Sequence, residues 1–148
     1  MNIMFICTGN ICRSAMAHWM IEKQVKEQNK DINVYSCGVY AENYDIPTKE
    51  AIQVMKEYGV DLTNHKATNI RNSDIEDMDV ILCATVNHKN MVISMYPELI
   101  DKVFTMKEYA GYPSYDLDIS DPWGYGMDVY KKCAEEIEIC IEKILEKI

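Results

Sequence analysis

Short apolar runs alternate with amphipathic stretches along the 148 residues of this chain. Residues 3–6 and 80–84 are apolar at almost every position, which is typical of parallel strands that are buried on both faces. Residues 32–36 and 102–105 are two further short segments with strand character, and Gly38 closes the first of these two. The pattern therefore predicts four short strands within the first 105 residues.

The segments between these strands carry apolar residues at spacings of three and four, which predicts amphipathic helices. We expect the first helix to begin at Arg13 or Ser14, and Thr48 and Gly59 to cap the two ends of the second. Residues 108–125 are rich in tyrosine and aspartate and are interpreted as a loop. The expected helices cover residues 13–30, 49–58, 73–77, 87–95 and 127–148.

Strands that alternate with helices indicate the α/β class. We expect a single Rossmann-like domain over residues 1–148, with a small four-stranded parallel sheet, right-handed crossovers and helices on both faces. Ligands of such folds bind beyond the carboxyl ends of the strands. The loop after the first strand and the loop after the fourth strand should therefore open on the same edge of the sheet.

Composition and charge narrow the possible functions. Hydrophobic residues make up 48% of the chain and charged residues 26%, as in an ordinary globular protein, and no apolar run approaches the length of a membrane span. A net charge of −9 without a basic stripe argues against nucleic acid as a partner. The six cysteines are scattered and no secretory signal is visible, so we expect a cytoplasmic protein without a disulfide framework.

The loop after the first strand carries the candidate chemistry. A turn between a strand and a helix N-terminus aims backbone N–H groups at one point, which makes an anion site. The Cys7 thiol and the Arg13 guanidinium stand at the two ends of this loop. Arg13, the loop amides and the helix N-terminus all favour a Cys7 thiolate that attacks phosphorus, and Arg13 can clamp two of the phosphoryl oxygens. Gly9 and Asn10 suit its unusual backbone, and the Ser14 hydroxyl can donate to the thiolate. The loop residues between and beside the two are Thr8, Gly9, Asn10, Ile11, Cys12 and Ser14.

A thiolate that attacks phosphorus needs a proton donor for the leaving group. Asp116, Asp118 and Asp121 lie in the loop that should open on the same sheet edge. Asp121 is the preferred candidate because Pro122 restricts its backbone and Trp123 can shield its carboxyl group. We interpret the other two aspartates as turn residues. Cys7 and Cys12 lack the spacing of a zinc knuckle and no matching Cys/His pair follows, so no metal and no cofactor are expected.

The loop sequence CTGNICRS and the later DPW resemble the low-molecular-weight protein-tyrosine phosphatases over essentially the whole chain. The resemblance implies that Cys7 is the nucleophile, Arg13 the phosphate clamp and Asp121 the general acid and base, without a metal. It further implies a network that supports the loop, formed by Asn10, Ser14, Ser36 and His65. Cys12 matches a second loop cysteine that, in the family, forms a reversible disulfide with the nucleophile. His18 departs from the family, which often has a glutamate near this position.

The implied substrate is a phosphorylated protein or peptide, and the implied product is inorganic phosphate. Ile11 is expected to floor the pocket, and Tyr40, Trp123 and Tyr125 to hold a phosphotyrosine ring. A similar bacterial branch of the family removes phosphate from arginine, and it carries threonine where this chain has Ile11. Protein-tyrosine phosphatase is therefore the first hypothesis and protein-arginine phosphatase the second. Thioredoxin-coupled arsenate reductase and a non-catalytic phosphate-binding module follow.

Overall fold

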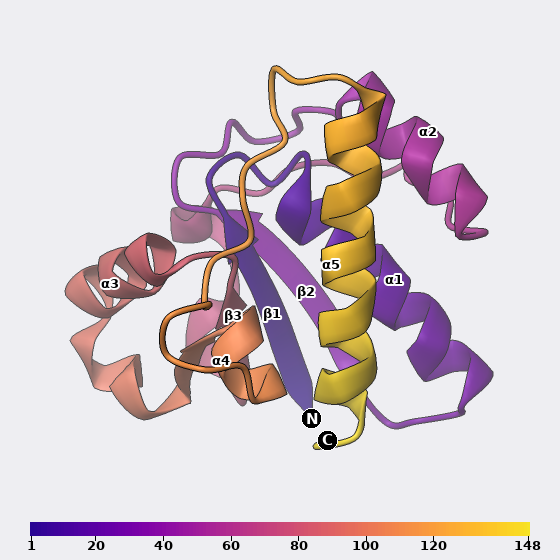
Figure 1. Cartoon of the computed structure of the whole chain (residues 1–148). Helices are drawn as coiled ribbons and strands as arrows, with labels where there is room; N and C mark the ends of the chain where they lie inside the picture. Colours follow the sequence, from indigo (N-terminus) through magenta and orange to yellow (C-terminus); the bar gives the residue numbers. More distant parts are fainter.

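Four parallel strands form one sheet at the centre of the protein, whose computed structural model describes residues 1–148 (Figure 1). The strands are β1 (Asn2–Cys7), β2 (Asn33–Gly38), β3 (Val80–Cys83) and β4 (Val103–Thr105), in the spatial order β2-β1-β3-β4. β1 lies between β2 and β3, and its last residue, Cys7, pairs with Gly38. The expected α/β class and the four-stranded parallel sheet are confirmed.

Helices cover both faces of the sheet because side chains of β1 alternate between two separate apolar cores. Ile3 and Phe5 belong to a core that includes residues of α1 and α5, whereas Met4 and Ile6 point into a core shared with Val92 of α3. Figure 1 shows α1 and α5 side by side, in agreement with their contacts, and α3 on the other side of the sheet, where it contacts β3 and β4. The helices are α1 (Arg13–Glu27), α2 (Lys49–Glu57), α3 (Val86–Met95), α4 (Met106–Ala110) and α5 (Met127–Leu145).

Two boundaries predicted from the sequence are wrong. The expected loop over residues 108–125 begins later, because α4 occupies Met106–Ala110. Thr105 caps this helix in a capping box with Glu108, a signal that is visible in the sequence as T-x-x-E. The expected helix over residues 73–77 is instead a pair of 3-10 turns, Ile70–Asn72 and Ile75–Asp77.

The caps of α2 are as predicted. The Thr48 hydroxyl accepts from the Ala51 N–H, and Gly59 follows the helix with a φ of +69°. None of the helices combines the length and the apolar character that a membrane crossing requires.

Gly38, at the end of β2, lets two backbone segments approach each other closely. A Cβ atom at this position would overlap the Thr8 carbonyl oxygen and would lie 2.9 Å from the Asn10 nitrogen. The segment after Gly38 is also tied to the start of the 7–14 loop, since the Val39 N–H donates to the Cys7 carbonyl and the Tyr40 N–H to the Thr8 carbonyl, both at 3.0 Å. The backbone at the end of β2 thus packs directly against the 7–14 loop and restricts its conformation.

Replacing Gly38 with alanine should therefore destabilise the protein. Both overlapping atoms belong to the backbone, so no side chain can move aside, and we expect the free energy of unfolding to fall by roughly 1–3 kcal/mol. Urea denaturation measures this change. Gly126→Ala is the matched control, because a Cβ there has open space around it and should cost less. Equal losses in the two variants would show that the close approach at Gly38 is not tight.

Candidate active site

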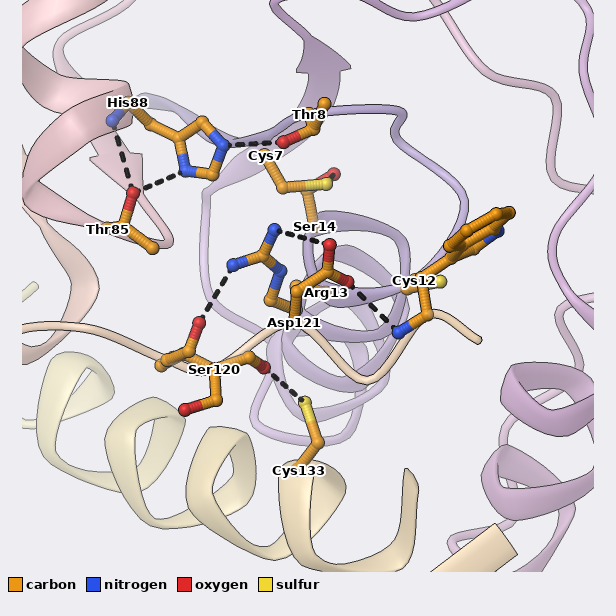
Figure 2. A network of polar contacts seen from close by, with 12 residues as sticks. Cys7, Thr8, Cys12, Arg13, Ser14, Thr85, His88, Ser120, Asp121 and Cys133 are labelled. Carbon is orange, nitrogen blue, oxygen red and sulfur yellow. Dashed lines mark hydrogen bonds and ion pairs between the residues drawn. The ribbon is translucent and has the colours of Figure 1, made fainter. Parts of the chain in front are cut away.

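A cavity of about 220 Å³ opens at the carboxyl end of β1, the position expected for a ligand site in this fold. It brings together the two ends of the 7–14 loop and Asp121, which lies more than a hundred residues further along the chain (Figure 2). The residues that line it are Cys7, Thr8, Gly9, Ile11, Cys12, Arg13, Asp121 and Trp123.

Asn10 shapes the loop from within. Its φ is +57°, in the left-handed region that asparagine tolerates better than most residues, and its side chain is fully buried. The Asn10 Oδ1 accepts from the Thr68 N–H at 3.0 Å, and its Nδ2–H donates to the Ser14 Oγ at 2.8 Å. One side chain thus joins the loop to the first turn of α1 and to a segment far away in the sequence.

His65, which the family resemblance places in the supporting network, is hydrogen-bonded to the backbone of Asn10. The Trp19 Nε1–H donates to the His65 Nδ1 at 2.9 Å, so the proton of the neutral ring is on Nε2, which donates to the Asn10 carbonyl at 2.9 Å. Burial lowers the pKa of His65, which keeps the ring neutral. The contribution of Trp19 was not predicted, because only the tertiary structure sets its indole against His65.

This chain of hydrogen bonds ends on the Cys7 sulfur with a defined direction. Because the Ser14 Oγ accepts from Asn10, its own O–H is left to donate to the Cys7 Sγ, 2.9 Å away. Cys7 is buried, and α1 begins at Arg13, so the helix N-terminus faces the same region. A hydrogen-bond donor and a helix N-terminus both stabilise negative charge placed next to them.

Arg13 is buried beneath the cavity and held at two points. Its Nη1 donates to the Ile119 carbonyl at 2.8 Å, and its Nη2 lies 3.6 Å from the Asp121 Oδ2 (Figure 2). The Nε–H is buried without any hydrogen-bond partner in the protein. An unpaired buried donor typically costs about 1–3 kcal/mol, and the guanidinium keeps one donor that no group of the protein uses.

Asp121 reaches the cavity from the 111–126 loop. This loop is anchored to the sheet where the Ile119 N–H donates to the Ala84 carbonyl at 2.9 Å, just beyond β3. The Asp121 Oδ1 accepts from the Trp123 N–H at 3.1 Å, which orients the carboxyl group toward Arg13. The side chain is nonetheless 54% exposed, so the Trp123 ring, itself largely exposed, does not shield it as expected.

Three predicted site residues lie away from the cavity. The Ser36 hydroxyl is paired with the His18 Nδ1 at 2.7 Å and makes no hydrogen bond to the 7–14 loop. The reason is register, since Ser36 pairs with Phe5 and only Gly38 reaches the level of Cys7. Tyr40 and Tyr125 are 73% and 64% exposed and do not line the cavity, whereas Ile11 and Trp123 do.

Cys12 lines the same cavity as Cys7, but in a different environment. Its Sγ lies 3.3 Å from the Tyr130 Oη and 3.7 Å from the Thr48 Oγ1. Burial raises the pKa of the Cys12 thiol to about 11, so it is protonated at neutral pH. All six cysteines are unpaired and buried, as expected for the four outside the loop, and no group of three or more metal-binding side chains is present.

His88 is a polar residue of this region that sequence reasoning missed. It lies in the first turn of α3, is buried, and its Nε2 is 2.8 Å from the Thr8 Oγ1. Burial lowers its pKa to about 4, and the positive charge of Arg13 acts in the same direction. The sequence T-x-x-H directly after the apolar run 80–84 was the available signal, because it places the histidine at the same sheet edge.

Comparison with known proteins gives a consistent result over the whole chain. The model of the family "Low molecular weight phosphotyrosine protein phosphatase" matches residues 2–148. The protein-arginine-phosphatase of Geobacillus stearothermophilus is 34% identical over 146 residues, 99% of this chain and 95% of that protein. The low-molecular-weight protein-tyrosine-phosphatase PtpB of Staphylococcus epidermidis is 33% identical over 144 residues, 97% and 96% of the two chains. The crystal structure of a low-molecular-weight protein tyrosine phosphatase from T. tengcongensis is 40% identical, with a TM-score of 0.94 and 100% and 99% coverage.

The hydrogen bond from Ser14 to Cys7 can be tested by the reactivity of the thiol. In Ser14→Ala the thiolate loses its donor, so alkylation of Cys7 by iodoacetamide at pH 7 should slow by about tenfold. Mass spectrometry of the Cys7 peptide separates this reaction from that of the other cysteines. Ser36→Ala serves as the control and should react like wild type, because Ser36 is bonded to His18 instead. Unchanged alkylation in Ser14→Ala would contradict the assigned direction of the hydrogen-bond chain.

Proposed function

Because the chain belongs to the low-molecular-weight phosphotyrosine protein phosphatase family, we propose that it hydrolyses protein phosphomonoesters with Cys7 as nucleophile, Arg13 as phosphate clamp and Asp121 as general acid and base. The observation that carries these roles is the single cavity lined by all three side chains. A thiolate, a buried guanidinium and a proton donor are the groups that such a reaction requires, and none of four other cavities of this protein contains a comparable set.

The first step transfers the phosphoryl group to sulfur. The Cys7 thiolate attacks phosphorus, the bond from phosphorus to the substrate oxygen breaks, and Asp121 gives its proton to that oxygen. Arg13 and the backbone N–H groups of the 7–14 loop hold the phosphoryl oxygens, where negative charge is concentrated. The salt bridge between Arg13 and Asp121 is long, at 3.6 Å, so the guanidinium remains available to the phosphoryl group.

The second step releases inorganic phosphate. Asp121, now ionised, takes a proton from a water molecule as the water oxygen attacks phosphorus, and the bond from phosphorus to the Cys7 sulfur breaks. The Ser14 O–H stabilises the departing thiolate through the hydrogen bond it makes at 2.9 Å. Exposure of the Asp121 carboxyl group gives water access to it in this step.

Phosphotyrosine is the substrate that we favour, within a phosphorylated protein or peptide. Ile11 lines the cavity beside Trp123, and an aliphatic side chain next to an indole suits an aromatic leaving group. The relatives include enzymes named for phosphotyrosine and others named for phosphoarginine, so protein-arginine phosphatase is the alternative. The guanidinium of phosphoarginine carries several N–H donors. An isoleucine side chain has no acceptor atom, so it cannot form hydrogen bonds with them.

Two other functions have less support. Arsenate reduction coupled to thioredoxin needs further cysteines that reach a protein reductant, whereas Cys37 and Cys83 are fully buried on β2 and β3. A module that only binds phosphate would not need a carboxyl group beside the guanidinium, and Asp121 is held in that place.

We also propose that Cys12 protects Cys7 from irreversible oxidation. Peroxide converts the Cys7 thiolate to a sulfenic acid, and the Cys12 sulfur then displaces water from it to form a disulfide, which a thiol reductant reopens. Both sulfur atoms belong to residues that line one cavity, which supports the pairing. Such a cycle requires a reducing compartment, and six unpaired cysteines suit the cytoplasm.

The catalytic roles are tested by two substitutions. Cys7→Ser should abolish hydrolysis of an aryl phosphate, since serine lacks a thiolate, and Asp121→Asn should lower kcat by roughly 10²–10⁴-fold because the proton donor is lost. Steady-state kinetics measure both, and circular dichroism verifies the fold. Asp118→Asn is the control for a carboxyl group in the same loop that does not line the cavity. Turnover by Cys7→Ser at the wild-type rate would exclude the mechanism.

The choice of substrate is tested by comparing phosphotyrosine and phosphoarginine peptides of one sequence. The wild type should have the higher kcat/KM for phosphotyrosine, and Ile11→Thr should shift the ratio toward phosphoarginine by about tenfold, because a hydroxyl group can accept from the guanidinium. Ile11→Val keeps an aliphatic side chain and is the matched control. A wild type that prefers phosphoarginine would make the alternative correct.

A further inference from the structure

His88 connects α3 to the residue that directly follows the proposed nucleophile. Figure 2 shows its ring between two hydroxyl groups, with Thr85 on one nitrogen and Thr8 on the other. Both hydrogen bonds are 2.8 Å long, and His88 is 95% buried, with a relative exposure of 5%. A buried ring with two short hydrogen bonds has a fixed orientation, so it also fixes the hydroxyl of Thr8.

The contacts of Thr85 indicate which nitrogen of His88 carries the proton. As the cap of α3, the Thr85 Oγ1 accepts from the His88 backbone N–H at 3.2 Å. If the Thr85 O–H donates to the Nδ1, every hydrogen-bonding group of this pair is used, whereas a proton on Nδ1 would leave that O–H without an acceptor. The favoured ring is therefore protonated on Nε2, which donates to the Thr8 Oγ1.

This assignment leaves the O–H of Thr8 free. Its oxygen is occupied as an acceptor by His88, and the side chain makes no other hydrogen bond in the protein. Thr8 also lines the cavity that contains Cys7 and Arg13. The hydrogen bond from His88 fixes the position of the Thr8 oxygen, and the Thr8 O–H is left to donate to a ligand in the cavity.

We propose that the Thr8 hydroxyl donates to an oxygen of the phosphoryl group bound over Cys7, and that neutral His88 is the positioning residue that holds it for this contact. The inference rests on the proposed function, because that function makes a phosphoryl group the ligand of the cavity. It adds a side-chain donor to the guanidinium of Arg13 and the loop amides. It also makes α3, on the far side of the sheet from α1, a structural support of the site.

A charged His88 is not required for this role. The Arg13 guanidinium and burial both disfavour the imidazolium, while Asp118 and Asp121 favour it more weakly. His88 therefore acts through its orientation at neutral pH and adds no positive charge to the cavity. This distinguishes it from Arg13, whose charge neutralises the phosphoryl group.

The first experiment measures binding of inorganic phosphate, which is independent of turnover. Isothermal titration calorimetry should show roughly 3–10-fold weaker binding for Thr8→Val, which keeps the shape of threonine but lacks its hydroxyl. Thr8→Ser should recover most of the loss. Asn90→Ala, on the exposed side of α3, controls for changes in that helix. Equal affinities of wild type and Thr8→Val would overturn the proposal, even if Cys7→Ser confirms the phosphatase mechanism.

The second experiment separates positioning by His88 from a general effect on the fold. His88→Leu should weaken phosphate binding as much as Thr8→Val, the double variant should lose no more than either alone, and His88→Gln, which can place an amide N–H near the Nε2 position, should restore part of the affinity. Nitrogen-15 NMR of the imidazole should find the proton on Nε2 at pH 7. A proton on Nδ1, or additive losses in the double variant, would contradict the assigned role.

Discussion

The shape of the proposed phosphate site depends on the buried side chain of Asn10. Its backbone takes up a left-handed conformation, and its amide group satisfies partners on two separate elements, Thr68 and Ser14. A polar group that is fully buried must find such partners or destabilise the fold, so the same bonds that stabilise the loop also give it one conformation. Hydrogen bonds then run in one direction, from Trp19 through His65, Asn10 and Ser14 to the sulfur of Cys7.

Elements on both sides of the sheet converge on this loop. Gly38 at the end of β2 shapes its backbone, α3 contributes His88, and the 111–126 loop brings the carbonyl of Ile119 to Arg13. The parallel arrangement makes this possible, because all four strands end at the same edge. The proposed nucleophile, clamp and acid therefore line one cavity although Asp121 is far from Cys7 in the sequence.

Much of the fold and the centre of the site were accessible to sequence reasoning. Apolar runs and helical periodicity predicted the strands and the main helices, and the 7–14 loop together with Asp121 identified the residues that line the cavity. Sequence reasoning failed where a local pattern was compatible with two interpretations. The capping box joins Thr105, the last residue of an expected strand, to Glu108, the first residue of an expected loop, so α4 was missed. Tyr40 and Tyr125 were assigned to the pocket as aromatic residues near the loop, although they do not line the cavity.

The sequence by itself determined the α/β class, the 7–14 turn and the family, because each can be recognised from local residue patterns, namely the alternation of strands and helices and the motifs CTGNICRS and DPW. The tertiary structure decided which distant side chains support the turn: Trp19 and His65 behind Asn10, His88 beside Thr8, and His18 as the partner of Ser36. Register explains the last case, since a shift of two residues along β2 separates Ser36 from the level of Cys7. Pairings across strands and helices depend on packing of the whole chain, and no local pattern of residue types specifies them.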